Sequence, residues 1–372
     1  MKHINNLVLE FELLLEKPKS RFDQLISNLR DRITYRDLSK ILSEEKISKA
    51  AGWDKLLEKL NSADAALTER AEQSLKSLHT GFVLAGTKDA FVYELDESTL
   101  ASIQKGFINL NVSEGNFTAS YPLVLSSTEL AKLTFDHELA HKEIHESGDI
   151  SLVFCARRSE EDRVTYKYSE VTQAVQSAFK GFEEFIAVRR TNYQIFDVIT
   201  LRPKLRRIEV LIDHPGKIRG TETSELRCLA LLGRLATAIL AVQKIYDANM
   251  PLNLVHCISG LYHAKTEGRV SNLSFRTPNG SVNKGALPSQ DLRTDPFHKS
   301  GVTAVGDVTP YDVTISWDKL ITAKGSVSVQ IGMPISGLSS DDCYVKNARI
   351  IGARTDAAVV GVINKLVSYS TI

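Results

Sequence analysis

The chain has 372 residues, of which 43% are hydrophobic and 24% are charged, and its formal net charge is +1. This length predicts two or three domains, and the composition is that of a folded globular protein, which excludes an intrinsically disordered chain. A net charge so close to zero also excludes a general electrostatic attraction of the whole molecule to nucleic acid or to acidic membranes.

The cysteines and the apolar segments indicate in which cellular compartment the protein is found. The sequence contains four cysteines: Cys155, Cys228, Cys257 and Cys343. They lie far apart without a CxxC pair, which argues against a cysteine zinc site or a disulfide framework and is typical of a reducing compartment. Acidic residues interrupt residues 1–16, so this segment does not read as a secretory signal. The longest apolar run, residues 226–242, contains Arg227 and Arg234 and is shorter than the roughly 20 residues of a membrane span. We therefore expect a cytoplasmic protein without a membrane segment.

The first 80 residues are predicted to form a helical module, because apolar residues recur there at spacings of three and four. The expected helices cover residues 7–15, 21–32, 35–42, 47–60 and 63–79. The break at residues 43–45 gives two of them the form of a helix-turn-helix. However, residues 1–80 carry 14 Lys and Arg against 13 Asp and Glu, without the basic face of a groove-binding helix. A helical packing module is therefore favoured over DNA binding.

Residues 81–200 are predicted to form a central α+β domain. Strands are expected at residues 82–84, 91–95, 107–112 and 117–125, with a short helix at 98–105. A long helix is predicted over residues 127–146, with Ser127 or Thr128 as its N-cap and Gly148 at its end. Strands at 150–156 and 163–168 follow, and then a second long helix over residues 170–193.

Residues 201–372 are predicted to form a C-terminal α+β domain. The expected strands are 207–212, 270–275, 312–317 and 327–331, and the expected helices are 224–246 and 357–367. Residues 276–309 are rich in Gly, Pro, Asn, Ser and Asp, which predicts long loops. The predicted fold class of the whole chain is therefore α+β.

One short motif indicates chemistry, an HExxH sequence at residues 137–141. On a helix, the i and i+4 spacing would place the imidazoles of His137 and His141 on one face, close enough to bind one Zn²⁺. Glu138 would then take a proton from the zinc-bound water, whose pKa the metal lowers. A third ligand is needed, and the second predicted helix offers Glu183 or Glu184.

This pattern resembles the gluzincin metallopeptidases, which combine HExxH on one helix with a Glu ligand on a later helix, often followed three residues on by Ala. Glu184 with Ala187 matches that pattern better than Glu183. The resemblance covers about residues 127–190 and implies a zincin-like central domain. Lys142 departs from the small or apolar residue that gluzincins usually have after the second His.

The resemblance implies that His137, His141 and Glu184 bind Zn²⁺ and that Glu138 is the general base. A Tyr or His usually stabilises the oxyanion in such a site, and Tyr166 and Tyr168 lie between the two predicted helices. We take Tyr168 as the candidate, and the alternative is a strand tyrosine that packs on a sheet.

Two hypotheses of function follow. The first is a zinc-dependent hydrolase, a metallopeptidase with a protein or peptide substrate. The second is a non-catalytic binding or assembly protein, either a nucleic-acid-associated factor or a subunit of a large complex, in which HExxH is fortuitous. Residues 189–227 hold nine Lys or Arg against five Asp or Glu, so they would contact phosphates, form a solvated face or pair with the acidic residues 160–162. The oligomeric state stays open.

Overall fold

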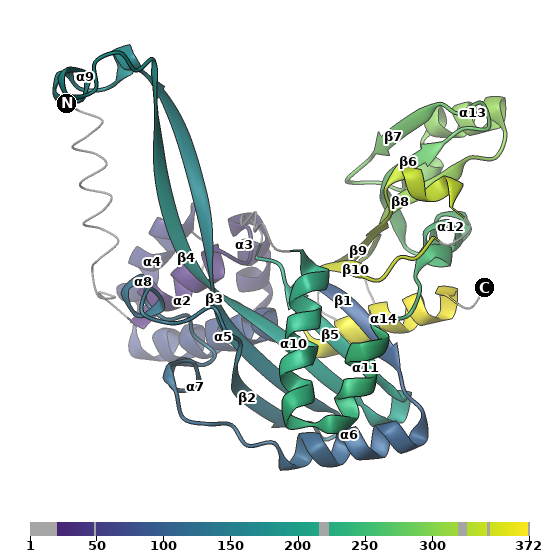
Figure 1. The fold of residues 1–372 in the computed structure, drawn as a ribbon, viewed down its shortest axis with the longest axis horizontal. Coiled ribbons are helices and arrows are strands. Elements are labelled where there is room, and N and C mark those ends of the chain that lie inside the picture. The colour runs from purple at the N-terminus through teal and green to yellow at the C-terminus, as the bar shows by residue number, and fades with distance from the viewer. Residues whose placement is uncertain (1–20, 48–49, 216–222, 319–325, 341–342, 371–372) are drawn as a thin grey trace.

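A computed structural model describes residues 21–47, 50–215, 223–318, 326–340 and 343–370 (Figure 1). It combines a helical N-terminal region with a large antiparallel sheet, which confirms the predicted α+β class. The predicted helix at residues 7–15 lies outside the described residues. Within the described part of the chain, no helix has both the length and the apolar character needed to cross a membrane.

The helical region contains the other four predicted helices, with their ends shifted by up to six residues. They are α2 (Arg21–Arg30), α3 (Tyr35–Glu44), α4 (Trp53–Asn61) and α5 (Ala65–Leu84). Their apolar faces bury one cluster that includes Leu38, Leu56 and Leu75. The strand predicted at residues 82–84 is wrong, because α5 continues through it. There Phe82 packs into the helical cluster while Val83 packs into a core of the sheet, so the last turn of α5 joins the two.

Within the described residues, ten strands form one continuous antiparallel sheet. They are β1 (Gly86–Glu94), β2 (Glu138–Ile144), β3 (Ile150–Lys167), β4 (Glu184–Arg202), β5 (Arg207–Asp213), β6 (Arg269–Arg276), β7 (Val282–Ala286), β8 (Thr309–Trp317), β9 (Val327–Gly332) and β10 (Ala348–Ala353). Their order in the sheet is β2-β3-β4-β5-β1-β10-β9-β8-β6-β7. The predicted domain boundary at residues 200–201 falls within β4, and the sheet continues across it.

Helices cover both faces of this sheet. One face carries α6 (Glu97–Asn109), α10 (Ser224–Ala238) and α11 (Gln243–Ala248), and the core beneath them includes Phe91, Leu152, Ile199 and Leu231. The opposite face carries α12 (Val255–His263) and α14 (Asp356–Ser370), with a core that includes Val153. Residues 276–309, predicted to be loops, also contain β7 and α13 (Pro296–Val305).

Two predicted strands are replaced by helices. Residues 107–112 were expected to be extended, but α6 continues to Asn109. Residues 117–125 were also expected to be extended, but α7 (Asn116–Ser120) occupies their start. In both segments a single buried phenylalanine, Phe107 or Phe117, anchors the helix to a core, so the alternation of apolar residues was too short to define a strand.

Both long helices of the predicted zinc domain are wrong. Of residues 127–146, only α8 (Ser127–Leu130) is helical, with Ser126 as its N-cap, and β2 takes up residues 138–144. Of residues 170–193, only α9 (Gln173–Ala178) is helical, and β4 begins at Glu184. Pairing with β3 on both of its sides overrides the helix propensity of these segments.

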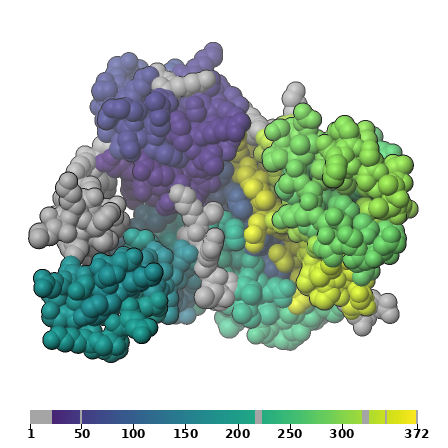
Figure 2. All heavy atoms as spheres, turned by 90° about the horizontal axis from the view of Figure 1, so that it is seen from above, coloured from purple at the N-terminus to yellow at the C-terminus, as the bar shows by residue number. Residues whose placement is uncertain are grey.

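The long hairpin of β3 and β4 leaves the sheet as an arm. Each of the 18 residues of β3 has a partner in β4, whereas β2 pairs with β3 only as far as Cys155 and β5 pairs with β4 only as far as Val198. Residues 156–167, at about 3.3 Å each, therefore extend about 40 Å as a two-stranded ribbon. Figure 1 shows the arm rising from the body with α9 at its end, and Figure 2 shows its teal end at one corner of the molecule.

Candidate interaction site on the hairpin arm

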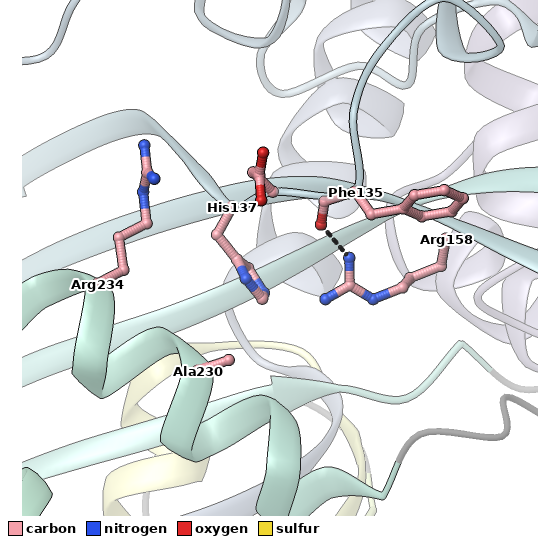
Figure 3. Close-up of a pocket in the computed structure, with 6 residues that line it drawn as sticks. Phe135, His137, Arg158, Ala230 and Arg234 are labelled. Carbon is pink, nitrogen blue, oxygen red and sulfur yellow. Dashed lines mark hydrogen bonds between the residues drawn. The ribbon is translucent and has the colours of Figure 1, made fainter.

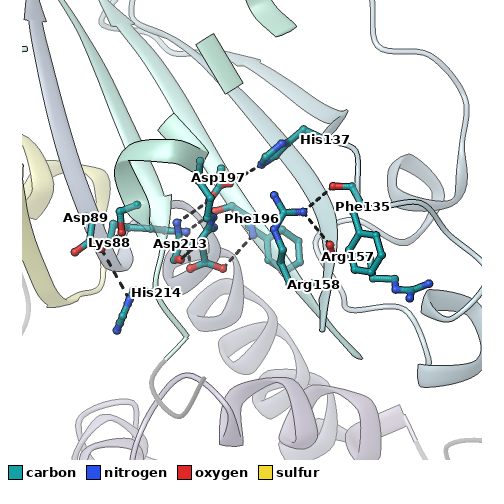
Figure 4. Close-up of polar contacts among 12 residues, drawn as sticks. Lys88, Asp89, Phe135, His137, Arg157, Arg158, Phe196, Asp197, Asp213 and His214 are labelled. Atoms are coloured by element: carbon teal, nitrogen blue, oxygen red, sulfur yellow. Dashed lines mark hydrogen bonds and ion pairs between the residues drawn. The ribbon is translucent and has the colours of Figure 1, made fainter. Parts of the chain in front are cut away.

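The HExxH motif lies at the edge strand β2 and not on a helix. The Nε2 atom of His137 is 2.8 Å from Oδ2 of Asp197, which also binds α10 through Arg227 (Figure 4). The ring of His141 instead stacks on Tyr121, with 4.5 Å between ring centroids, and Tyr121 packs against the core of the opposite face. A register shift between Leu139 and His141 accompanies this change of side. The two imidazoles therefore lie on opposite faces of the sheet.

The third predicted ligand is remote from both histidines. Glu184 pairs with Lys167 at the far end of the arm, and thirteen residues of β4 separate it from Asp197. At about 3.3 Å per residue, that separation is about 43 Å. Among the described residues, no group of three or more His, Cys, Asp or Glu side chains is placed to hold a metal ion. The zinc centre therefore stays a prediction from the motif, because this arrangement does not assemble the proposed ligands.

The two predicted catalytic side chains also lie apart. Glu138 pairs with Cys155 at the start of β2, whereas Tyr168 lies beyond the end of β3 at the tip of the arm. The hydroxyl of Tyr168 donates to the carbonyl oxygen of Gln176 over 2.6 Å, and its ring lies 6.2 Å from that of Phe185. Tyr168 therefore holds the tip together, and it does not face Glu138.

At the root of the arm, β4 and β5 separate. There the side chains of Asp197 and Asp213 take the place of the backbone–backbone hydrogen bonds between the two strands. The backbone N–H of Asp213 donates to Oδ1 of Asp197 over 2.7 Å, and the backbone N–H of Phe196 donates to Oδ2 of Asp213 over 3.0 Å (Figure 4). Both carboxylates are buried. A side-chain carboxylate of each strand thus accepts a hydrogen bond from a backbone N–H of the other strand, beyond their last regular pair. These bonds fix the direction in which the arm leaves the sheet.

Cations from three elements neutralise these carboxylates. Lys88 of β1 lies 2.9 Å from Asp213, Arg32 after α2 makes two bonds to it, and Arg227 of α10 donates to Asp197 over 2.7 Å. Burial alone would raise the pKa of Asp213, but Arg32 and Lys88 outweigh burial and hold that pKa below its ordinary value. The charged cluster therefore ties the arm root to the helical module, the sheet and α10.

The shaft of the arm is held in register by charge. Arg190 stands opposite Glu161 and Arg189 stands opposite Asp162, with N–O distances of 3.3 Å and 3.1 Å. The predicted pairing of this basic segment with the acidic residues 160–162 is confirmed for these two arginines. Exposed ion pairs contribute only about 0–1 kcal/mol each, but charges along open strand edges also discourage unspecific pairing with other chains.

The end of the arm is an aromatic cluster. The ring of Phe179 lies 6.0 Å from Phe185 and 6.2 Å from Phe182, both in edge-to-face geometry. The side-chain amide of Gln176 donates to the carbonyl oxygens of Tyr168 and Val171, which fastens α9 to the turn before it. Local contacts thus give this end a defined shape, although α9 buries none of its residues.

Large apolar side chains at this end face solvent. We call Val164, Phe179, Phe182, Ile186 and Val188 the arm tip. Phe182 is 61% exposed, Ile186 is 60% exposed and the other three are at least 43% exposed. Scattered exposed apolar residues are common, but these five lie together at the end of a projecting ribbon, with Val164 on one face and Ile186 and Val188 on the other. Such a concentration of exposed apolar side chains marks an interaction site.

The sequence analysis does not predict the arm tip, because it predicts a helix over residues 170–193. The sequence contains two signals for a turn and a strand. Gly181 is a turn residue, and its φ of +92° in the structure is one that favours glycine; aromatic and β-branched residues follow it, among them Phe182, Phe185, Ile186 and Val188. The matching charges of residues 160–162 and 189–190 also favour a hairpin over the predicted helix at residues 170–193.

Comparison with known proteins does not identify the chain: its sequence matches no protein-family model and has no significant match among curated proteins.

Proposed function

We propose that this chain is a non-catalytic assembly protein, a subunit of a larger complex, whose arm tip inserts into an apolar groove of a protein partner. The observation that carries this proposal is the exposed arm tip at the end of a ribbon about 40 Å long. Burying one large apolar side chain contributes about 1.5–3 kcal/mol, so a groove that closes around both faces of the inserted ribbon supplies a strong driving force for association.

The chemistry of the tip favours a protein over a membrane. Charged side chains around it are the basic Arg163, Lys167, Lys180 and Arg189 and the acidic Asp162, Glu170, Glu183 and Glu184. They give no excess of positive charge and therefore no attraction to acidic lipid. Aromatic residues, in contrast, are enriched at the buried centres of protein interfaces. The rigid charged root supports the same proposal, because a preoriented arm loses less conformational entropy on binding.

The test is the mass of the native complex. The chain, tagged at its C-terminus and expressed at its natural level, is purified from its own cells and measured by light scattering. We expect a defined species above the 41.3 kDa of one chain. The double variant Phe182→Ser, Ile186→Ser should elute as a monomer with an unchanged melting temperature, because neither side chain belongs to a buried core.

The matched control is Phe297→Ser on α13, which removes an equally large side chain that is 89% exposed and lies outside the arm. It should leave the mass of the complex unchanged. A wild-type protein that stays a 41.3 kDa monomer at all concentrations would overturn the proposal, and so would a double variant that keeps the full mass of the complex.

A further inference from the structure

A pocket of about 390 Å³ opens between α10 and the start of β2, on the face of the sheet opposite to His141. Its lining residues are Phe135, Asp136, His137, Arg158, Ala230 and Arg234 (Figure 3). This volume is near the lower end of the roughly 300–1,000 Å³ that is usual for small-molecule sites. The arm tip plays no part in it.

Two arginines approach the pocket from different walls. On β3, the guanidinium of Arg158 donates to the carbonyl oxygens of Phe135 and Arg157 over 2.7 Å and 2.9 Å, which fixes its position. On α10, Arg234 makes no ion pair or side-chain hydrogen bond with the described part of the chain. Ala230 lies one turn before it on the same helical face, and its small side chain leaves the space between the walls open.

His137 forms a third polar wall. Its Nε2 atom is held by the buried carboxylate of Asp197, so Nδ1 is the nitrogen that remains for a ligand, and it has no hydrogen-bond partner within the described residues. Figure 3 shows the imidazole between α10 and the guanidinium of Arg158. Among the described residues that line the pocket, Asp136 is the one acidic side chain, against two guanidinium groups.

We propose that this pocket binds a phosphate group, free or on a small ester, with Arg158 and Arg234 as charged contacts and His137 as a third contact that donates from Nδ1–H when both ring nitrogens carry a proton. Guanidinium groups on two walls suit a tetrahedral anion that presents oxygens in several directions, whereas a planar carboxylate is satisfied by one of them. A nucleic-acid backbone fits less well, because the nearby Arg189 and Arg190 are paired with acidic residues of the arm and provide no basic track.

The test measures binding of inorganic phosphate and of glycerol 3-phosphate to the full chain by calorimetry. Arg234→Gln should weaken binding about tenfold, as expected for the loss of one charge-assisted hydrogen bond. Ala230→Leu should abolish binding by filling the pocket. Asp136→Asn should tighten binding several-fold, because it removes the only negative charge of the lining. Circular dichroism and melting curves establish that each variant is folded.

The matched control is Arg36→Gln, which removes an exposed arginine from α3, outside the pocket. It should bind phosphate like the wild type. Tighter binding of the ester assigns an ester as the ligand, and tighter binding of inorganic phosphate assigns the free ion. No binding by the wild type, equal losses in Arg234→Gln and Arg36→Gln, or displacement of both probes by a short oligonucleotide would overturn the proposal.

Discussion

Two buried polar side chains near the arm root differ in how well their hydrogen-bonding groups are satisfied. Asp213 has three donors around it, Lys88, Arg32 and the N–H of Phe196. His79 of α5 is also fully buried, yet neither of its ring nitrogens has a hydrogen-bond partner in the described structure. Removing one partner of the Asp213 ion pairs should cost about 3–5 kcal/mol, the usual value for a buried pair. The unpaired imidazole of His79 can stay buried only in its neutral form, because burying an unpaired charge costs far more.

His79 therefore makes the protein sensitive to mild acid. Burial, helped by the charge of Arg32, lowers the pKa of His79 from 6.5 to about 3. Below pH 6.5 the unfolded chain binds a proton at this residue and the folded chain does not. The free energy of unfolding therefore falls by up to about 1.4 kcal/mol for each unit by which the pH is lowered. His79→Leu should remove this contribution between pH 6.5 and about 4.

The measurement is urea unfolding at several pH values. At pH 7 the variant should be at least as stable as the wild type, because the imidazole makes no hydrogen bond that the variant loses. His145→Leu, which changes a partly exposed histidine bonded to Ser151, serves as the comparison. Parallel pH profiles for wild type and His79→Leu would contradict this account of His79.

At the scale of elements, the sequence predicted best where one face of a segment decides its structure. The helices of the N-terminal module and the strands β5, β6, β8 and β9 lie close to their predicted ranges, because their apolar residues recur with a clear period. In contrast, β3 is one strand where two, at residues 150–156 and 163–168, were predicted. Residues 138–144 have no such period, and their mixture of Glu, Leu, His and Lys fits a helix and a strand equally well. Their pairing with β3 makes them a strand, and a contact with a distant segment cannot be predicted from the local sequence.

The zinc hypothesis depended on helices at both residues 127–146 and residues 170–193, and its ligands can be tested directly. Because β2 places His137 and His141 on opposite faces, we expect less than one zinc per chain after excess metal is removed. Metal content by mass spectrometry on protein without an affinity tag checks this. About one zinc per chain, lost in His141→Ala but retained in Glu138→Gln, would instead support a zinc hydrolase.

At the scale of the whole molecule, the arm and the body have separate stabilities. Within the described structure, none of residues 157–193 belongs to the three buried clusters. A two-stranded ribbon is only marginally stable on its own, so its order depends on the anchored root and on the cluster at its end. The body, in contrast, has two cores that extend across the sheet.

Deletion of the arm should therefore leave the body folded. Residues 159–192 are replaced by Asn-Gly, which closes a tight hairpin between the directly opposed Arg158 and Tyr193. We expect a melting temperature within a few degrees of the wild-type value, since no core residue is lost. We also expect loss of the native complex, as for the arm-tip variant. Unfolding of the shortened chain, measured by calorimetry, would show that the arm contributes to the core.

The way in which the arm enters the sheet also has a mechanical consequence. The hydrogen bonds of β3 and β4 to their neighbours run perpendicular to the strands. A pulling force on the arm tip along the ribbon therefore loads those bonds in shear, so that many of them must break together instead of one after another. The buried ion pairs at the root lie in the same path. A partner that pulls on the tip would thus transmit tension to the body before the arm could be stripped from the sheet.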